Sequence, residues 1–156
     1  MEEEDFESYL PLHTDPDVMR FVGGRHDEEF VRQRFDRLRL QWVERGLGHW
    51  ATFEKETGAL VGAVGLRQHD DWTATPYNIE VGWLIGKEFW NRGYATEAAR
   101  PFIPYAFDRL GLDRLICIVA PENISSRRVA EKLGFRVAGE TFWRDHKVIW
   151  YELARG

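Results

Sequence analysis

The sequence predicts an α/β protein of the α+β kind, folded as one domain over residues 1–156. Apolar residues recur with the period of a helix in some segments and alternate as in strands in others. These segments follow one another in the order helix, helix, three strands, helix, strand, helix, two strands. With 156 residues, 44% of them hydrophobic, the chain can bury one core without disulfides or metals. No internal repeat or linker divides it.

Two helices are predicted at the start of the chain. The first covers residues 3–13, and Asp15-Pro16 either ends it or begins a short second helix. Gly23-Gly24 then breaks the chain. The next helix runs from Asp27 to Arg45 and ends at Gly46, because its apolar residues fall on one face. That face consists of Val31, Phe35, Leu38 and Trp42.

Strands are predicted for His49–Glu54, Leu60–Gln68 and Tyr77–Ile85, and the turn Glu56-Thr57-Gly58 makes the first two a hairpin. A helix follows from Ala95 to Leu110 and ends at Gly111.

That helix contains Pro101 and Pro104, each of which costs about 3 kcal/mol in a regular helix interior. We therefore expect a kink there. The remaining segments are a buried strand, a helix and a final hairpin. They cover Arg114–Ala120, Ile124–Leu133, and Arg136–Trp143 with Lys147–Leu153.

Composition excludes several classes of function. The net charge is −5, with Lys and Arg scattered rather than gathered in a stripe, which argues against nucleic acid as a partner. No apolar run is long enough to span a membrane and the acidic start lacks a signal-peptide pattern, so we expect a cytoplasmic protein. The lone Cys117 lies in an apolar run and is predicted to be a buried structural thiol. The five His residues lack ligand spacing, so no metal site is expected.

One turn carries the strongest functional signal. Between Asn91 and Glu97 the chain reads NRGYATE, after the apolar run Ile79–Ile85 and before a helical stretch. A strand, a turn with one Gly and a helix start aim several backbone N–H groups at one spot, which favours phosphate. The turn lacks both the G-x-G-x-x-G spacing and the G-K-[ST] ending. It therefore predicts a different phosphate-bearing cofactor.

These residues resemble the cofactor turn of the GNAT acetyltransferases, which reads Gln/Arg-x-x-Gly-x-Gly/Ala. Here the segment from Trp90 to Ala95 fills it, with Trp90 in place of Gln or Arg. A second match, PENISSRRVAEKLGF from Pro121 to Phe135, is similar to the family's helix after the fifth strand. With the strand Asn78–Gly86, the resemblance covers about residues 78–135 and is closest to the ribosomal-protein N-terminal acetyltransferases.

This resemblance implies the GNAT fold, with a mixed, mostly antiparallel central sheet and helices on both faces. It also implies acetyl-CoA as cosubstrate. The diphosphate would bind the amides at the helix start, with Arg92 as a nearby cation, and the pantetheine arm would follow the central strand. The implied cofactor-binding residues are Trp83, Leu84, Ile85, Arg92, Gly93, Tyr94, Ala95, Thr96, Asn123 and Ser126.

Glu80 is the predicted general base. It shares a strand face with Asn78 and Gly82, among apolar neighbours, and burial would raise its pKa to a value suited to accepting a proton. The alternatives are a Glu on a solvated sheet face and one paired with Arg67. The residues from His69 to Asp71, in the loop before this strand, could contact an amine substrate, but we expect a solvated loop.

Ser126 is the second catalytic candidate. Many GNAT enzymes protonate the thiolate with a Tyr, whose position here is Ala130, and the resemblance implies that Ser126 lies near the sulfur instead. Asn123 and Ser126 also fit the plain role of helix-capping residues. Tyr105 is a reserve candidate.

The predicted activity is transfer of an acetyl group from acetyl-CoA to a primary amine by direct attack. The acceptor is a protein N-terminus or a small amine such as a polyamine or an aminoglycoside. The alternative is a non-catalytic CoA-binding sensor or assembly module. A Rossmann-type enzyme is disfavoured, because no Gly-rich turn follows the first strand.

The start of the chain departs from the family pattern. Members usually begin with a strand, whereas MEEEDFESYL reads as helix. Without that strand, the segment from Trp50 to Phe53 becomes a sheet edge, which a second copy in a homodimer or an altered terminus would cover.

Overall fold

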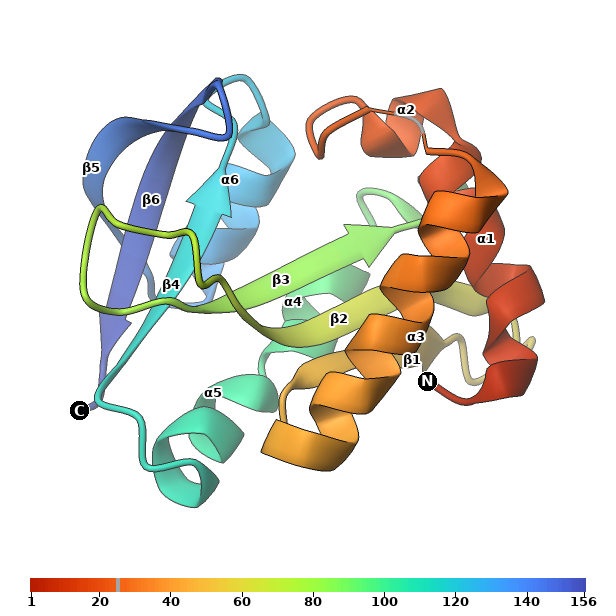
Figure 1. Ribbon diagram of the computed structural model, residues 1–156, viewed down its shortest axis with the longest axis horizontal. Coiled ribbons are helices and arrows are strands. Elements are labelled where there is room, and N and C mark those ends of the chain that lie inside the picture. Colours follow the sequence, from red (N-terminus) through yellow and green to blue (C-terminus); the bar gives the residue numbers. More distant parts are fainter. Residues whose placement is uncertain (25) are drawn as a thin grey trace.

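The computed structural model describes residues 1–24 and 26–156. Six strands form one sheet in the order β1-β2-β3-β4-β6-β5 (Figure 1). The strands are β1 (Gly48–Phe53), β2 (Leu60–Gln68), β3 (Ile79–Ile85), β4 (Arg114–Val119), β5 (Arg136–Trp143) and β6 (His146–Ala154). The α-helices are α1 (Phe6–Thr14), α2 (Pro16–Met19), α3 (Glu28–Arg45), α4 (Tyr94–Ala99), α5 (Phe102–Pro104) and α6 (Ile124–Lys132). A 3₁₀ turn, Glu3–Asp5, precedes α1, and another, Lys87–Phe89, follows β3.

The sheet is mixed and mostly antiparallel, as expected. Every strand pair is antiparallel except β3 and β4, which are parallel and pair in register only at Glu80 and Ile116. Beyond that pair the two strands diverge toward their C-terminal ends (Figure 1). The two strands are therefore unpaired beyond Glu80 and Ile116, in the middle of the sheet.

Capping residues determine where the helices near the start of the chain begin and end. Asp15 caps α2 by accepting hydrogen bonds from the amides of Asp17 and Val18, so the short second helix is confirmed. Asp27 caps α3 in the same way, with its carboxylate 2.8 Å from the Phe30 amide. Gly46 ends α3 in the left-handed conformation, with φ of 65°, which a glycine adopts without strain.

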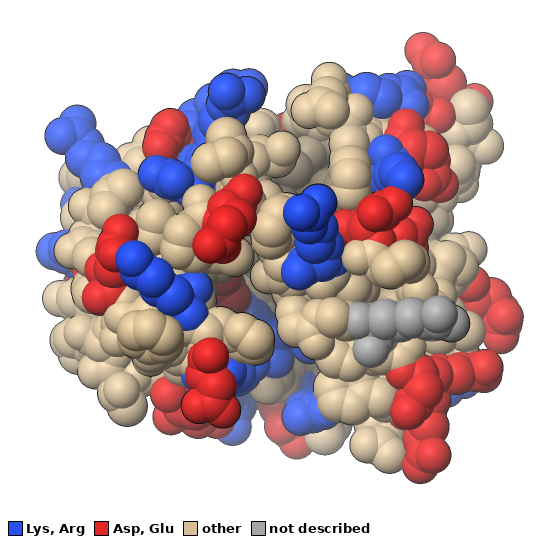
Figure 2. All heavy atoms as spheres, turned by 90° about the horizontal axis from the view of Figure 1, so that it is seen from above, with Lys and Arg blue, Asp and Glu red and all other residues tan. Residues whose placement is uncertain are grey.

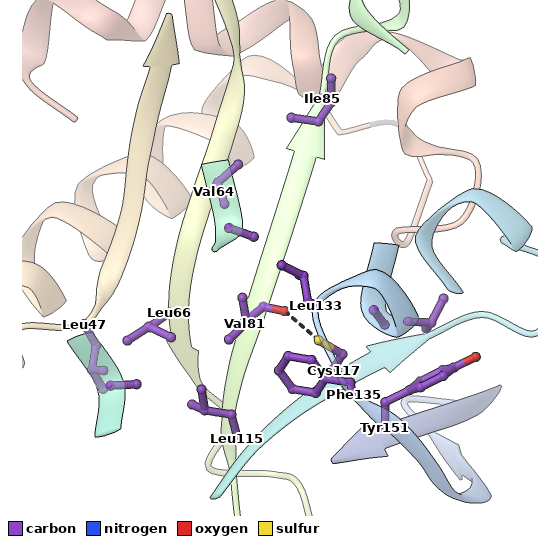
Figure 3. Packing of buried hydrophobic residues seen from close by; sticks show 14 of the residues in the cluster. Leu47, Val64, Leu66, Val81, Ile85, Leu115, Cys117, Leu133, Phe135 and Tyr151 are labelled. Carbon is purple, nitrogen blue, oxygen red and sulfur yellow. Dashed lines mark hydrogen bonds between the residues drawn. The ribbon is translucent and has the colours of Figure 1, made fainter. Parts of the chain in front are cut away.

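Helices cover both faces of the sheet. Helices α1 and α3 pack on β1 and β2, where Phe6, Tyr9 and Phe35 form a compact cluster with Ala63. On the other face α4 packs on β2 and β3, and α6 on β4. The larger core lies here (Figure 3). Its central members include Val64, Leu66, Val81, Leu115, Cys117, Phe135 and Tyr151.

The helix is irregular where the kink was expected. After α4 the helix is interrupted at Arg100–Pro101, resumes as α5, and continues as a π-helical segment from Tyr105 to Arg109. Proline has no N–H and clashes with the preceding turn, so regular hydrogen bonding stops there.

Strand β1 is the edge of the sheet, as predicted, and within the described residues no strand precedes α1. Trp50 and Phe53 on it are each 48% exposed. None of the described helices has both the length and the apolar character that crossing a membrane requires.

Candidate active site

The opening between β3 and β4 contains a cavity of about 120 Å³. Glu80 lies at its closed end, where the two strands still pair. Its walls come from at least six elements, so distant parts of the chain meet there. The lining includes Tyr9 and His13 of α1, Arg34 of α3, Arg67 of β2, Gly82, Trp83 and Leu84 of β3, Ile118 and Val119 of β4, and Asn123 and Ser126 at the start of α6.

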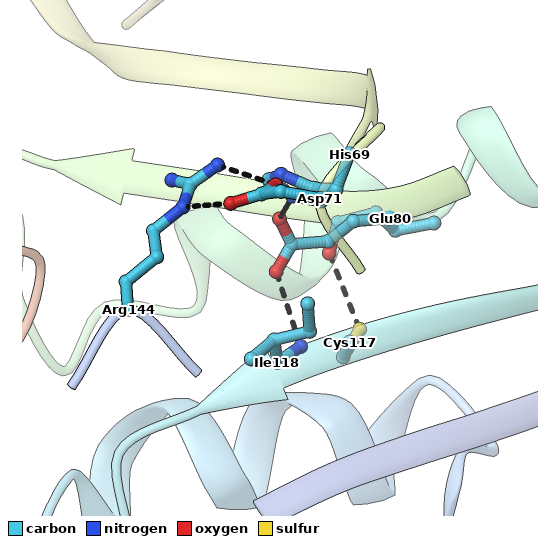
Figure 4. A network of polar contacts seen from close by, with 7 residues as sticks. His69, Asp71, Glu80, Cys117, Ile118 and Arg144 are labelled. Carbon is cyan, nitrogen blue, oxygen red and sulfur yellow. Dashed lines mark hydrogen bonds and ion pairs between the residues drawn. The ribbon is translucent and has the colours of Figure 1, made fainter. Parts of the chain in front are cut away.

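Both oxygens of Glu80 have partners (Figure 4). One, Oε2, lies 2.6 Å from Nε2 of His69, and the other, Oε1, accepts a hydrogen bond of 3.1 Å from the Ile118 amide. That amide is free to donate because β4 has already turned away from β3. The Glu80 side chain is 16% exposed. Glu80 therefore holds the diverging strands together while it faces the cavity.

His69 was expected in a solvated loop, and this prediction is wrong. Its side chain is 2% exposed and packs edge-on against Trp143, with the ring centroids 4.8 Å apart. The loop between β2 and β3 folds back over the sheet, and Asp71 joins it to the β5–β6 hairpin by two hydrogen bonds from Arg144, of 2.7 and 2.9 Å. The sequence does contain a signal for this arrangement: His69 directly follows the strand that ends at Gln68, and Trp72 lies in the loop after it.

The predicted rise in the pKa of Glu80 is also wrong. Burial does raise the pKa of this carboxyl, but hydrogen bonds from His69 and the Ile118 amide, together with the charge of Arg67, lower it below the ordinary value. Among the described residues Glu80 pairs with His69 and forms no ion pair with Arg67, its register partner on β2. Glu80 is thus ionised at neutral pH.

His49 and Arg34, which were not singled out from the sequence, line the same cavity as Glu80. A Cβ built on Gly82 would lie 3.6 Å from His49 Nε2 and 3.8 Å from Glu80 Oε2, so both side chains flank the same point. Burial, and then the charges of Arg34 and Arg67, keep the pKa of His49 well below its usual value. The imidazole is therefore neutral. Arg34 comes three residues after the buried Val31 and therefore lies on the same face of α3. The spacing in the sequence could have indicated this position.

Trp83 and Ser126 meet across the opening. The Trp83 indole N–H donates to the Ser126 hydroxyl at 3.2 Å. Asn123 accepts a hydrogen bond of 3.2 Å from the Ser126 amide, so its capping role is confirmed. Leu84 lines the cavity, whereas the Ile85 side chain is buried in the core.

The turn at Gly93 has the backbone that phosphate binding needs. Gly93 has φ of 83° and an added Cβ would meet nothing within 4 Å. Helix α4 starts at Tyr94, and its first hydrogen bond runs from the Glu97 amide to the Gly93 carbonyl at 3.0 Å. The amides of Tyr94, Ala95 and Thr96 therefore have no acceptor within the helix. Trp90 ties this turn to β3, because its indole N–H donates to the Ile85 carbonyl at 2.8 Å.

Arg92 is not the free cation that was expected. Its guanidinium lies 2.6 Å from the Glu54 carboxylate, which also accepts a hydrogen bond from the Tyr94 hydroxyl. This arrangement holds the end of β1 against the turn and puts a negative charge beside it.

Cys117 has the structural role that was predicted for it, and Tyr105 also has a structural role. Cys117 is buried, its thiol donates to the Val81 carbonyl at 3.2 Å (Figure 3), and burial raises its pKa well above the ordinary value. Tyr105 donates to the Gly46 carbonyl at 3.1 Å, away from the cavity, so it no longer serves as a reserve acid. The described residues contain no cluster of His, Cys, Asp and Glu that could hold a metal.

Comparisons with known proteins agree with the geometry. A family model described as "Acetyltransferase (GNAT) domain" matches residues 1–136. The uncharacterized N-acetyltransferase YnaD of Bacillus subtilis (strain 168) is 41% identical over 137 residues, 87% of this chain and 76% of YnaD. The putative ribosomal N-acetyltransferase YdaF of the same strain is 34% identical over 106 residues, 63% of this chain and 55% of YdaF.

Solved structures extend the similarity to the whole fold. The acetyltransferase of Agrobacterium tumefaciens str. C58 matches with a TM-score of 0.86 and 28% identity, over 99% of this chain and 88% of that one. Three findings agree with one another: the fold, the turn at Gly93, and the match of the family model to most of the sequence. This chain belongs to the GNAT family of acetyltransferases.

Proposed function

We propose that this acetyltransferase transfers the acetyl group of acetyl-CoA to a primary amine by direct attack, without an acyl-enzyme. The observation that carries the proposal is the position of Glu80, an ionised carboxylate at the closed end of the opening between β3 and β4. Ser126 lines the same cavity, so an amine that reaches Glu80 shares the cavity with the Ser126 hydroxyl. No activated nucleophile lies among the described cavity residues, which favours direct attack.

The residues present fit acetyl-CoA, which supplies an acetyl thioester and a thiolate leaving group. The amides of Arg92 to Thr96 would hold the diphosphate, since Gly93 leaves the space beside them open. The diverging strand from Trp83 to Ile85 offers main-chain groups to the pantetheine arm. Arg92 would contact phosphate only after releasing Glu54.

Glu80 is the proposed base. The ionised carboxylate attracts the amine, which loses its first proton to solvent and attacks as the neutral form. The nitrogen gains positive charge and becomes acidic as it bonds to carbon, and Glu80 accepts the proton that it then releases. His69 lies 2.6 Å from the Glu80 carboxylate, so the change in charge on Glu80 is spread over both side chains. The proton passes from the nitrogen to Glu80 as the nitrogen–carbon bond forms and the carbon–sulfur bond breaks.

Ser126 is proposed to stabilise the departing sulfur. Its oxygen already accepts a hydrogen bond from Trp83, which leaves its own O–H free to donate. The lack of a Tyr at position 130 does not exclude chemistry, because a hydroxyl is present on the same helix one turn earlier.

Glu80→Gln tests the proposal. The variant keeps the shape of the side chain, so we expect kcat to fall by about 10²- to 10⁴-fold with an unchanged Kd for CoA. Glu44→Gln, at an exposed position on α3, is the matched control. Because hydrogen bonds and nearby charges lower the pKa of Glu80 below its ordinary value, its titration should lower the rate only at a pH more acidic than that at which a free carboxyl titrates. An unchanged kcat in Glu80→Gln would remove Glu80 as the base.

The closest rival is a CoA-binding module without activity. It predicts tight CoA binding and no acetylation of any amine. The ionised Glu80 and the free hydroxyl of Ser126 favour catalysis over this alternative. On the face shown in Figure 2, acidic and basic side chains are interspersed among the described residues, which supports a small acceptor rather than nucleic acid. A cytoplasmic location and a homodimer paired along β1 remain predictions.

A further inference from the structure

Two arginines meet in the cavity beside Glu80. Arg67 is on β2 directly across from Glu80 in the β2–β3 register, and Arg34 reaches the cavity from the buried face of α3. The Nε of Arg34 is buried and has no hydrogen-bond partner. Among the described residues neither guanidinium forms an ion pair with a carboxylate. The Glu80 carboxylate pairs with His69 instead. Within the part of the chain that the structure describes, the cavity therefore holds two guanidinium groups without an ion-pair partner, and the more distant charge of Glu80 only partly offsets that of Arg67.

A half-buried guanidinium without an ion-pair partner destabilises a protein, so this arrangement needs a reason. Burial, and then repulsion from Arg34, lowers the pKa of Arg67 to about 10. The same causes lower the pKa of His13 to about 3, so that histidine adds no charge. His49 is likewise neutral. The positive charge of the cavity wall thus comes from the two arginines.

We propose that the acceptor is a small amine that also carries an anionic group, a carboxylate or a phosphonate, which Arg34 and Arg67 bind while the amine faces Glu80. This inference rests on the proposed function. Cross-strand neighbours have Cβ atoms about 4.5–5.5 Å apart, so the amine and the anion are separated by only a few bonds. An amino acid with a short carbon chain meets this condition.

The size and charge of the cavity agree with such an acceptor. Its volume of about 120 Å³ is close to that of an engineered cavity of about 150 Å³ that binds benzene. A short amino acid is of this size. A polyamine or an aminoglycoside would instead bring further positive charge toward Arg34 and Arg67.

Pairs of acceptors that differ only in carrying a carboxylate or its amide test the proposed anion subsite on the wild-type protein. We would measure kcat/KM with glycine, β-alanine and γ-aminobutyrate, with the amides of the same acids, and with spermidine. We expect each acid to exceed its amide by about ten-fold or more, as for a hydrogen-bonded charge pair. 2-Aminoethylphosphonate tells the two anions apart, because a preference for it identifies a phosphate-like group. Equal rates for acids and amides would overturn the inference while leaving amine acetylation intact.

Variants locate the subsite. Arg67→Gln and Arg34→Gln should each remove most of the preference for acids over amides, whereas Arg67→Lys should keep part of it. Arg37→Gln, exposed on the same helix as Arg34, is the control and should behave as wild type. Retention of the full preference in both Gln variants would overturn the assignment.

A binding measurement separates this inference from the proposed function. Propionate carries the anion without an amine, so calorimetric titration of the wild-type protein with propionate needs no turnover. Heat that disappears in Arg67→Gln would support the subsite even if no amine were acetylated. Absence of binding by propionate, together with equal rates for acids and amides, would refute it.

Discussion

Acidification should destabilise this protein through His13. Its side chain is 1% exposed, and neither ring nitrogen has a hydrogen-bond partner. Burial is the main cause that lowers its pKa from 6.5 to about 3, and the charge of Arg34 adds to it. In the unfolded chain the ring takes up a proton near pH 6.5, whereas in the folded chain it does so only near pH 3.

The size of the effect follows from these two values. Between pH 6.5 and 3 the unfolded state binds more protons, so the free energy of unfolding falls as the pH falls through this window. The slope is about 1.4 kcal/mol per pH unit for one group. At pH 5 the loss from His13 alone is about 2 kcal/mol, and above pH 6.5 it vanishes.

Urea unfolding at pH 7 and pH 5 measures the loss, with His13→Leu as the test variant. Leu replaces a ring without polar partners, so the variant should match wild type within about 1 kcal/mol at pH 7. At pH 5 it should lose about 2 kcal/mol less than wild type. His146→Gln, at an exposed hairpin position, is the control and should follow wild type. Equal losses in wild type and His13→Leu would refute a neutral buried His13.

Two further predictions concern the turn. Gly93→Asp should abolish CoA binding in calorimetry, because it puts a negative side chain where the diphosphate is proposed to lie. Gly111→Asp has the same left-handed φ and equally open space, so it should cost similar stability and leave binding unchanged; equal binding by the two variants would count against the phosphate site. Glu54→Gln frees Arg92 and removes a like charge beside the phosphates, so CoA should bind a few-fold more tightly at low salt and the gain should shrink in high salt. Weaker CoA binding by this variant would instead mean that Glu54 orders the turn.

Much of the site's framework was predictable, because it depends on local sequence. The αL turn at Gly93 follows from a single glycine between a strand and a helix, and the interruption at Pro101 follows from the missing N–H of proline. The buried, inert Cys117 follows from its apolar run. The N-cap role of Asn123 also needed only the residues next to it.

The chemistry of Glu80 was not predictable in the same way. Strand alternation placed its side chain on the correct face, but it could not reveal that the β2–β3 loop folds back and brings His69 to 2.6 Å. The expected rise in pKa failed for that reason, since a hydrogen bond and nearby charges outweighed burial.

The sequence by itself determined the order of helices and strands, the glycine turn before α4 and the position of a carboxylate on the central strand. Each of these depends on residues a few positions apart, through periodicity, caps and turn conformations. Only the tertiary structure decided which groups surround Glu80, and that Arg34 and Arg67 face the same cavity. Charge–charge energies depend on distances between side chains of different elements, and those distances exist only once α1, α3, β2, β3 and β4 have packed together.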